Sequence, residues 1–586
     1  MEERLNIKDE IIKFIMKAIL FVYPLRHIFH GVDLWDTGYN YANFTYIENM
    51  DSMWYFSTYF ASLLGNLFTK LPLGDTYLGL NLYTGLTLSV LAVLGFWFCV
   101  EIVKLPKWIV FAGEFLAVCL SWCPTALLYN YLTYILMDVA VILLYLALRE
   151  ESKFTKLYFV LAGVCLGLNL FVRFSNLAQV SLILAVWAMA IIRKEKFGKV
   201  AGQTFTCVAG YLVGVGAGLG VVALRDGVGD YVNGIIRLLS MPSEASDYTV
   251  FSMIRGQIDS YVGNLKWVLC LLALVLVGML IYKVIPEKFK MVSGTVCVLL
   301  TVALVWWFHR IGVLLFWYDS LYGVFQWAIF FLWATHIIGI IVIFGKNFTE
   351  QEKLLCGLNI LVVLVTPLGS NNQLFAAMNN LYIAAPVTLW MLWRFVRRVP
   401  AKLNVKKLML SSIPAKLVIC MVILVLGYQS VRFSAGYVFT EATGGKEHTT
   451  YVENNDTLKW IKTDEEKAII LSEISEFVEE TNLKGKEVLL YGSIPSLSFY
   501  LEMPCVLSPW ADLRSYNYIV MEEVMTELQK DIDENGRDCP VIILNRETNM
   551  TDPNDKKGLL INDMIEKYGY KAAFGNDKFL LLMAEM

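Results

Sequence analysis

Apolar stretches of roughly twenty residues recur along most of the chain, separated by shorter polar segments. A stretch of this length can cross the hydrocarbon core of a bilayer as an α-helix, so each predicts a transmembrane span. The pattern therefore predicts an α-helical polytopic membrane protein with about thirteen transmembrane helices. The predicted spans cover residues 10–30, 78–103, 107–123, 125–148, 155–172, 175–192, 203–224, 265–282, 291–308, 325–345, 353–368, 381–396 and 414–433.

The polar segments between these spans are of two alternating kinds. One kind is short and rich in Lys and Arg, as at 193–199 and 397–407, and such loops stay in the cytoplasm. The other kind is acidic, aromatic or rich in amides, and includes the two longest segments, 31–77 and 225–264. With an odd number of spans, we expect a multi-pass protein of the cell membrane whose N-terminus is cytoplasmic and whose C-terminal domain is extracytoplasmic.

The composition changes after the last span. Residues 445–586 are rich in Glu, Asp and Lys but keep an ordinary share of apolar positions. Helical periodicity at 456–483 and 518–533 alternates with runs typical of strands, which cover 487–492, 541–544, 570–574 and 578–583. We therefore predict two domains, a multi-span transmembrane domain at 1–434 and a soluble extracytoplasmic α/β domain at 445–586.

Overall charge and cysteine usage exclude two classes of function. The net charge is −3, so no basic field suggests a nucleic-acid partner. The 11 cysteines form no CxxC pair and no His/Cys cluster with the spacing of a zinc site. The expected partners are the lipid bilayer and a membrane-associated substrate, with no nucleic acid.

Two carboxylates, Asp33 and Asp36, begin the first outer segment and are flanked by Trp35 and Tyr39. If this turn is helical, both acids can face one site. They could then bind a divalent metal such as Mg²⁺ or Mn²⁺, or one could act as a base beside an ionised partner. The alternative interpretation is a solvated acidic loop with an aromatic belt at the membrane interface.

Cationic side chains lie at the predicted outer ends of the helices. Arg173, beside Asn176, could clamp a phosphate with its planar guanidinium group, although it could also extend toward lipid headgroups. His309 and Arg310 form a second cationic pair, and Arg255 is a weaker candidate in the long outer loop. The sequence thus predicts acids and cations on the same face of the membrane.

Amides and one buried acid complete the candidate residues. Asn371 and Asn372 belong to a polar run, 369–373, that suits sugar hydroxyls or headgroups but could equally cap neighbouring helices. Asp138 lies at membrane depth, where an ionisable group is energetically costly. A structural hydrogen bond within the helical bundle would explain its presence there.

The many spans, the acidic and aromatic first outer loop, the interfacial stretch 52–69 and the terminal α/β domain together resemble the GT-C glycosyltransferases. This class includes the protein O-mannosyltransferases, the aminoarabinose transferases and the catalytic subunit of oligosaccharyltransferase. The resemblance covers the topology of the whole chain and, in residues, chiefly the segment 33–39 and the turn 173–176. In style the chain is most similar to glycosyltransferase-like membrane proteins of Gram-positive bacteria.

This resemblance implies an inverting hexosyltransferase that moves a monosaccharide from a polyprenyl-phosphate donor to a glycan, lipid or protein acceptor of the cell envelope. It implies that Asp33 or Asp36 is the acceptor base or a metal-binding acid. The donor phosphate would then bind Arg173, His309, Arg310 and Arg255, and the substrates would contact Trp35, Tyr39, Asn176, Asn371 and Asn372.

The chain departs from the pattern of the class in two places. Many relatives carry adjacent acids, whereas Leu34 and Trp35 separate them here, which leaves open which acid is catalytic. The Trp-Trp-Asp-Tyr-Gly signature of oligosaccharyltransferases is absent, and the segment 510–512 does not match it. Transfer of a preassembled oligosaccharide to asparagine is therefore not expected.

Two other functions remain open from the sequence. A transporter or flippase of a lipid-linked or anionic solute would carry ionisable residues near the bilayer midplane, where Asp138 is the main candidate, but the chain has no clear internal repeat. A non-catalytic envelope assembly protein would bind its partner through the C-terminal domain and would tolerate replacement of Asp33 and Asp36 by alanine.

Overall fold

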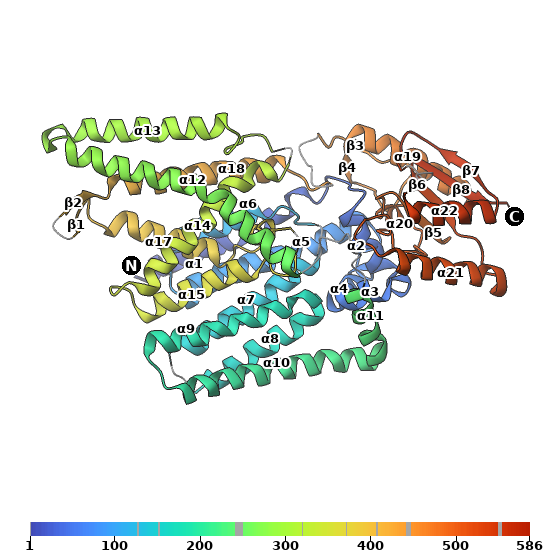
Figure 1. Cartoon of the computed structure of the whole chain (residues 1–586), viewed down its shortest axis with the longest axis horizontal. Helices are drawn as coiled ribbons and strands as arrows, with labels where there is room; N and C mark the ends of the chain where they lie inside the picture. Colours follow the sequence, from blue (N-terminus) through green and yellow to red (C-terminus); the bar gives the residue numbers. More distant parts are fainter. Residues whose placement is uncertain are drawn as a thin grey trace.

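Helices of predominantly apolar sequence lie side by side and an α/β region covers one end of them in the computed structural model of the chain (Figure 1). The structure describes residues 2–585, except for 126–127, 151–152, 241–249, 319, 371, 406–407, 441–446 and 549–553. Every predicted span corresponds to helix. The helices are α1 (Glu2–Val22), α5 (Tyr77–Trp97), α6 (Lys107–Leu120), α7 (Leu128–Arg149), α8 (Thr155–Val172), η4 (Phe174–Ile183) with α9 (Leu184–Arg193), α10 (Phe197–Arg225), α12 (Val250–Val284), α13 (Lys290–Arg310), α14 (Tyr322–Phe344), α15 (Glu350–Val365), α17 (Ala384–Arg398) and α18 (Ile413–Gly436).

Fewer of these helices than predicted are long enough to cross a membrane. In the described ranges, 9 helical stretches meet the length and hydropathy expected of a span, and α1, α6, α15 and α17 do not. The last three of these have 14, 16 and 15 residues. At about 1.5 Å per residue they reach roughly 21–24 Å, short of a hydrocarbon core of about 30 Å. The chain is a multi-pass membrane protein, and the predicted count of thirteen exceeds the 9 stretches that meet this measure.

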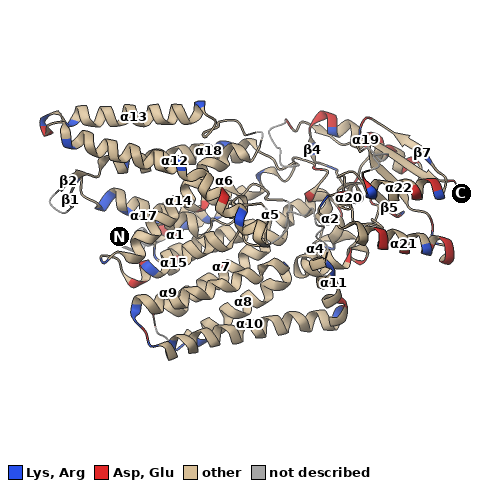
Figure 2. Cartoon of the chain, in the orientation of Figure 1, with Lys and Arg blue, Asp and Glu red and all other residues tan. Residues whose placement is uncertain are grey.

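The two kinds of polar segment lie at opposite ends of the helices. Figure 2 shows Lys and Arg at the α9–α10 and α12–α13 turns, at the end away from the α/β region. The acidic and aromatic segments 31–77 and 225–240 lie at the other end, beside that region (Figure 1). This arrangement agrees with the alternation predicted from the loops. Which end faces the cytoplasm stays a prediction.

Close backbone contact holds α8 against α10. Gly163 and Gly167 of α8 face Gly210 and Gly214 of α10, with four-residue spacing on both helices. A Cβ atom on Gly163 would lie 2.0 Å from the carbonyl oxygen of Cys207, and one on Gly214 would lie 2.4 Å from that of Val164. Small residues at this spacing let transmembrane helices approach closely, so the outer end of α8 is firmly positioned.

The two long outer segments fold into short helices. The first forms α2 (Asp36–Thr45), η2 (Ile47–Asn49), α3 (Ser52–Ser57) and α4 (Tyr59–Thr69), so the predicted amphipathic stretch is interrupted at Thr58. The second is largely helical, with α11 (Val228–Ser240) followed by the first half of α12, while 241–249 lies outside the described residues. The Tyr59 hydroxyl donates to a carboxylate oxygen of Asp226 at 2.6 Å, which joins the two segments.

The α/β region contains a four-stranded mixed sheet in the order β5-β6-β8-β7, in which only β5 and β6 are parallel. The helix predicted from 456 begins later, because Lys462 and Thr463 pair with β3 and Asp464 caps the helix by accepting from the Lys467 amide at 3.1 Å. The elements are β3 (Thr450–Tyr451), β4 (Lys462–Thr463), α19 (Glu465–Glu480), β5 (Val488–Tyr491), α20 (Leu497–Tyr500), α21 (Tyr518–Asn535), β6 (Val541–Asn545), α22 (Lys556–Lys567), β7 (Tyr570–Gly575) and β8 (Phe579–Ala584); a hairpin of β1 (Lys402–Val405) and β2 (Leu408–Ser411) precedes α18.

Candidate active site

The start of α2 is built around the carboxylate of Asp33. This carboxylate is fully buried and accepts hydrogen bonds from the Trp35 amide at 3.0 Å, the Thr37 amide at 3.1 Å and the Thr37 hydroxyl. The Ser496 hydroxyl of the α/β region adds a bond at 3.4 Å, and the Tyr500 hydroxyl donates to the Asp33 carbonyl. Asp33 therefore fixes the first turn of α2 and ties it to the α/β region.

Asp36 has different surroundings although it lies only three positions further along the chain. It is the first residue of α2, and its side chain is half-buried. Its carboxylate has no hydrogen-bond partner in the described part of the chain, and burial raises the pKa of Asp36 to about 6. An unpaired carboxylate with a raised pKa is suited to accept a proton. Of the two acids, Asp33 is thus the hydrogen-bonded one and Asp36 the unpaired one.

The hydrogen bonds to the Asp33 carboxylate also affect whether Asp33 and Asp36 could share a metal ion. A Mg²⁺ or Mn²⁺ ion takes several oxygen ligands, and an ion held by both acids would have to displace the donors that occupy the oxygens of Asp33. No group of three or more His, Cys, Asp or Glu side chains among the described residues is arranged to hold a metal. The residues present at Asp33 and Asp36 do not fit a two-carboxylate metal site.

Tyr39 lies one helical turn after Asp36 in α2 and contacts the α/β region. Its pKa is raised chiefly by burial, and Asp51, Tyr129 and Asp36 lie close enough for their charges to raise it further. The ring of Tyr39 lies edge-on to that of Trp510 in the α/β region, with ring centres 5.7 Å apart. Tyr39 therefore lies between Asp36, the start of α7 and the α/β region.

Arg173 directly follows α8 and lies against Tyr129, near the start of α7. Its guanidinium carbon is 5.1 Å from the ring centre of Tyr129, and its Nη2 donates to the Gly369 carbonyl at 3.1 Å. Its Nη1 is 3.4 Å from the side-chain oxygen of Asn130. Within the described ranges no carboxylate lies at ion-pair distance from this group. A cation held by neutral acceptors keeps its charge available for an anion.

Gly369 permits this contact because of its backbone conformation. Its φ is +86°, and a Cβ atom there would lie 2.4 Å from that of Ser175. A larger residue would push the Gly369 carbonyl away from Arg173. The acid begins α2 and the cation follows α8, and these two points lie at the same end of the helices, beside the α/β region (Figure 1). We call this end of α2, α7 and α8, with the turn at Gly369, the corner.

The other predicted cations lie elsewhere. His309 and Arg310 are exposed at the end of α13; the His309 Nδ1 is 2.9 Å from the Leu314 carbonyl. Figure 1 places α13 at the opposite edge of the helical array from α8. Arg255, on α12, is paired with Asp259 at 3.5 Å. None of these three cations is brought to Arg173.

The predicted substrate-binding residues also separate. Trp35 is exposed beside Asp36, and Tyr39, one helical turn after Asp36, is half-buried. Asn176 is buried and donates to the Thr133 hydroxyl at 2.8 Å, which places it in a structural network between α7 and η4. Asn372 is exposed, and Asn371 lies outside the described residues.

Several residues of the corner were not predicted. Tyr129 and Asn130 interrupt an otherwise apolar stretch, and this polar start of a span was the available signal. Ser496 and Tyr500 gave no such signal, because they lie more than 450 positions from Asp33 and contact it only in the folded chain.

No family model matches the chain, and no curated protein was found to be related to it. The chain is similar to the crystal structure of ArnT from Cupriavidus metallidurans bound to undecaprenyl phosphate, with a TM-score of 0.41 and 10% identity over 98% of this chain and 97% of ArnT. It is also similar to the archaeal oligosaccharyltransferase AglB from Archaeoglobus fulgidus, in complex with an inhibitory peptide and a dolichol-phosphate, with a TM-score of 0.47 and 12% identity over 96% of this chain and 73% of AglB. Both similarities extend over nearly the full length of this chain, at low sequence identity.

Proposed function

We propose that the chain is an inverting membrane glycosyltransferase. It transfers a monosaccharide from a polyprenyl-phosphate donor to a cell-envelope glycan, lipid or protein on the outer face of the membrane. The observation that carries this proposal is that the unpaired carboxylate of Asp36 and the unneutralised guanidinium of Arg173 belong to elements that lie at the same end of the helices (Figure 1).

In the proposed reaction, Asp36 takes the proton from an acceptor hydroxyl as that oxygen attacks the anomeric carbon of the sugar. The new bond joins the acceptor oxygen to this carbon, and the bond from the carbon to the phosphate oxygen breaks. The polyprenyl phosphate leaves with the bonding electrons, and Arg173 stabilises its charge. Attack opposite the leaving group inverts the anomeric configuration.

The acid at position 33 has a separate part in this proposal. Its carboxylate holds the amides of Trp35 and Thr37, so it sets the direction in which Asp36 points. Asp33 is thus a positioning residue, and Trp35 and Tyr39 supply aromatic faces beside the base.

The test is a transfer assay in membranes with labelled polyprenyl-phosphate sugars. Replacing Asp36 by asparagine keeps the shape of the side chain but removes the base, so we expect transfer to fall by about 10²–10⁴-fold with normal expression. Glu48→Gln is the matched control, because Glu48 is an exposed acid of the same segment. Full activity of the Asp36→Asn protein would overturn the proposal.

One observation favours the alternative of transport. Glu114 on α6 and Asp138 on α7 are fully buried, and none of their carboxyl oxygens has a hydrogen-bond partner among the residues that the structure describes. Unpaired acids inside a helical bundle are typical of ion or proton pathways. Proteoliposomes that translocate a fluorescent lipid-linked sugar in wild type, but not in Asp138→Asn, would favour a flippase over the transferase.

A further inference from the structure

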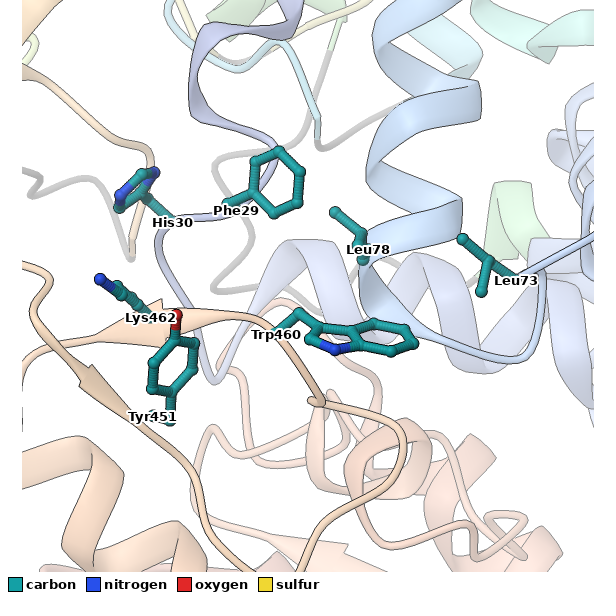
Figure 3. A pocket seen from close by; sticks show the side chains of 7 residues that line it. All are labelled: Phe29, His30, Leu73, Leu78, Tyr451, Trp460 and Lys462. Atoms are coloured by element: carbon teal, nitrogen blue, oxygen red, sulfur yellow. The ribbon is translucent and has the colours of Figure 1, made fainter.

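A groove lies where the α/β region meets the segment after α1 and the start of α5, and Asp36 is not among its lining residues. It consists of two neighbouring hollows of about 580 Å³ and 680 Å³, and Tyr451 and Trp460 line both. Hollows of this size suit small-molecule ligands. In Figure 3, His30 and Lys462 lie on one side of the first hollow and Leu73 and Leu78 on the other, with the Trp460 ring below them.

The aromatic rings of this junction groove are held open to solvent. Tyr451 is 51% exposed and Trp460 is 45% exposed. Trp460 also has a φ of +70°, in the left-handed region that a bulky residue seldom adopts. Strain of this kind persists only where surrounding structure imposes it, and it is concentrated at ligand sites.

Backbone hydrogen bonds supply that constraint. The Lys462 amide donates to the Phe29 carbonyl at 2.9 Å, and the Gly31 amide donates to the Lys462 carbonyl at 2.8 Å. On the other side of Trp460, the Tyr77 amide donates to the Thr457 carbonyl at 2.8 Å. The turn that carries Trp460 is therefore fastened to the segment after α1 and to the first residue of α5, which makes the groove a rigid feature.

The polar groups of the groove indicate the class of ligand. The side chains of Asn454 and Asp456 are exposed and make no hydrogen bond within the described part of the chain, so both are free to bind hydroxyls. Charge is nearly balanced along the two hollows, so the groove has no cationic excess that would select a phosphate. The acids are Asp456, Glu476, Glu479 and Glu480, and the lysines are Lys459, Lys462 and Lys484.

We propose that the junction groove binds a saccharide chain. The C–H faces of sugar rings carry partial positive charge and pack on the negative faces of aromatic rings. Here these are the faces of Tyr451 and Trp460 that are not covered by Lys462 and Lys459, whose ammonium groups lie 5.2 Å and 5.1 Å from the ring centres. The amide, carboxylate and ammonium groups beside these rings then bind the sugar hydroxyls. This site is separate from Asp36 and Arg173, and it does not depend on the proposed transfer reaction.

The experiment measures binding of tetrasaccharides of glucose, mannose and N-acetylglucosamine to the full chain in lipid nanodiscs, by saturation-transfer NMR without any donor. The variants are Tyr451→Ala and Trp460→Gly; glycine suits the positive φ, so the latter removes the ring while relieving strain. Tyr518→Ala is the matched control. Tyr518 is another tyrosine that is partly exposed and has a lysine, Lys556, over its ring, but it lies outside the groove.

We expect at least one tetrasaccharide to bind, each groove variant to weaken that binding at least tenfold, and Tyr518→Ala and Asp36→Asn to leave it within twofold. Binding that survives in Asp36→Asn keeps this result apart from the transfer assay. The proposal is overturned if no tetrasaccharide binds, or if binding is unchanged in both groove variants. It is also overturned if the groove variants alter only binding to phosphatidylglycerol vesicles.

Discussion

Arg173 at the end of α8 and the pair His309–Arg310 at the end of α13 were both predicted as phosphate-binding cations, yet their helices pack differently. Glycines bring α8 into backbone contact with α10. In the apolar stretch of α8, 44% of the residues are buried, against 22% in that of α13. The guanidinium of Arg173 is held by a carbonyl and an aromatic ring, while Arg310 is exposed. A cation can be directed at a ligand only where its helix is held in place.

The largest expected effect separates these two cations directly. Replacing Arg173 by alanine removes the charge that stabilises the leaving phosphate in the proposed reaction, so we expect kcat/KM for transfer to fall by about 10²–10³-fold. Arg310→Ala should leave kcat/KM within about twofold, because Arg310 ends α13, which lies at the opposite edge of the helical array from α8 (Figure 1). Steady-state transfer kinetics with purified protein measure both values. Equal losses in the two variants would contradict the comparison.

The sequence predicted the helices better than it predicted what their ends contact. Apolar length and loop charge located a helix at every predicted span and placed the two kinds of loop at opposite ends. The role of Asp33 could not be predicted, because Ser496 and Tyr500 reach it only after the α/β region docks on α2. Likewise, local sequence cannot show that Gly369 and Tyr129, from other elements, hold Arg173, whereas Arg310 lies over the ring of Trp306 in its own helix, 5.9 Å from the ring centre.

The next effect tests whether the α8–α10 contact holds the corner together. A methyl group on Gly214 would meet the Val164 carbonyl, whereas one on Gly216, two positions along the same helix, would meet nothing within 4 Å. We expect Gly214→Ala to destabilise the protein by about 1–3 kcal/mol through overpacking. Gly216→Ala should be neutral or slightly stabilising, because alanine favours helix. Thermal unfolding in detergent compares them, and equal melting temperatures would show that the contact is unimportant.

The pH dependence of transfer tests whether Asp36 is the base. Burial raises the pKa of Asp36 to about 6, so the carboxylate becomes protonated as the pH falls through that value. A protonated base is inactive, and kcat/KM should therefore fall about tenfold per pH unit below pH 6. Arg310→Ala should keep this profile, and Asp36→Asn should lack it. A wild-type rate that stays flat from pH 7 to pH 5 would exclude Asp36 as the base.

The smallest effect concerns the stability of the corner without regard to activity. The pKa of Asp36 is about 6 in the folded chain and about 3.9 in an unfolded one, so folding disfavours its ionised form. Wild-type protein should therefore lose stability as the pH rises from about 4 to about 6, whereas Asp36→Asn should not. Because the side chain is half-buried, the expected gain in stability of the Asp36→Asn variant at pH 7 is only on the order of 1 kcal/mol, and it should vanish below pH 4.

Asp33→Asn should instead lower the stability at pH 7, because it replaces a buried acceptor of several hydrogen bonds with a group that also carries donors. Melting curves of both variants across this pH range would measure the two signs, and a loss of stability in Asp36→Asn would mean that its carboxylate supports the fold as Asp33 does.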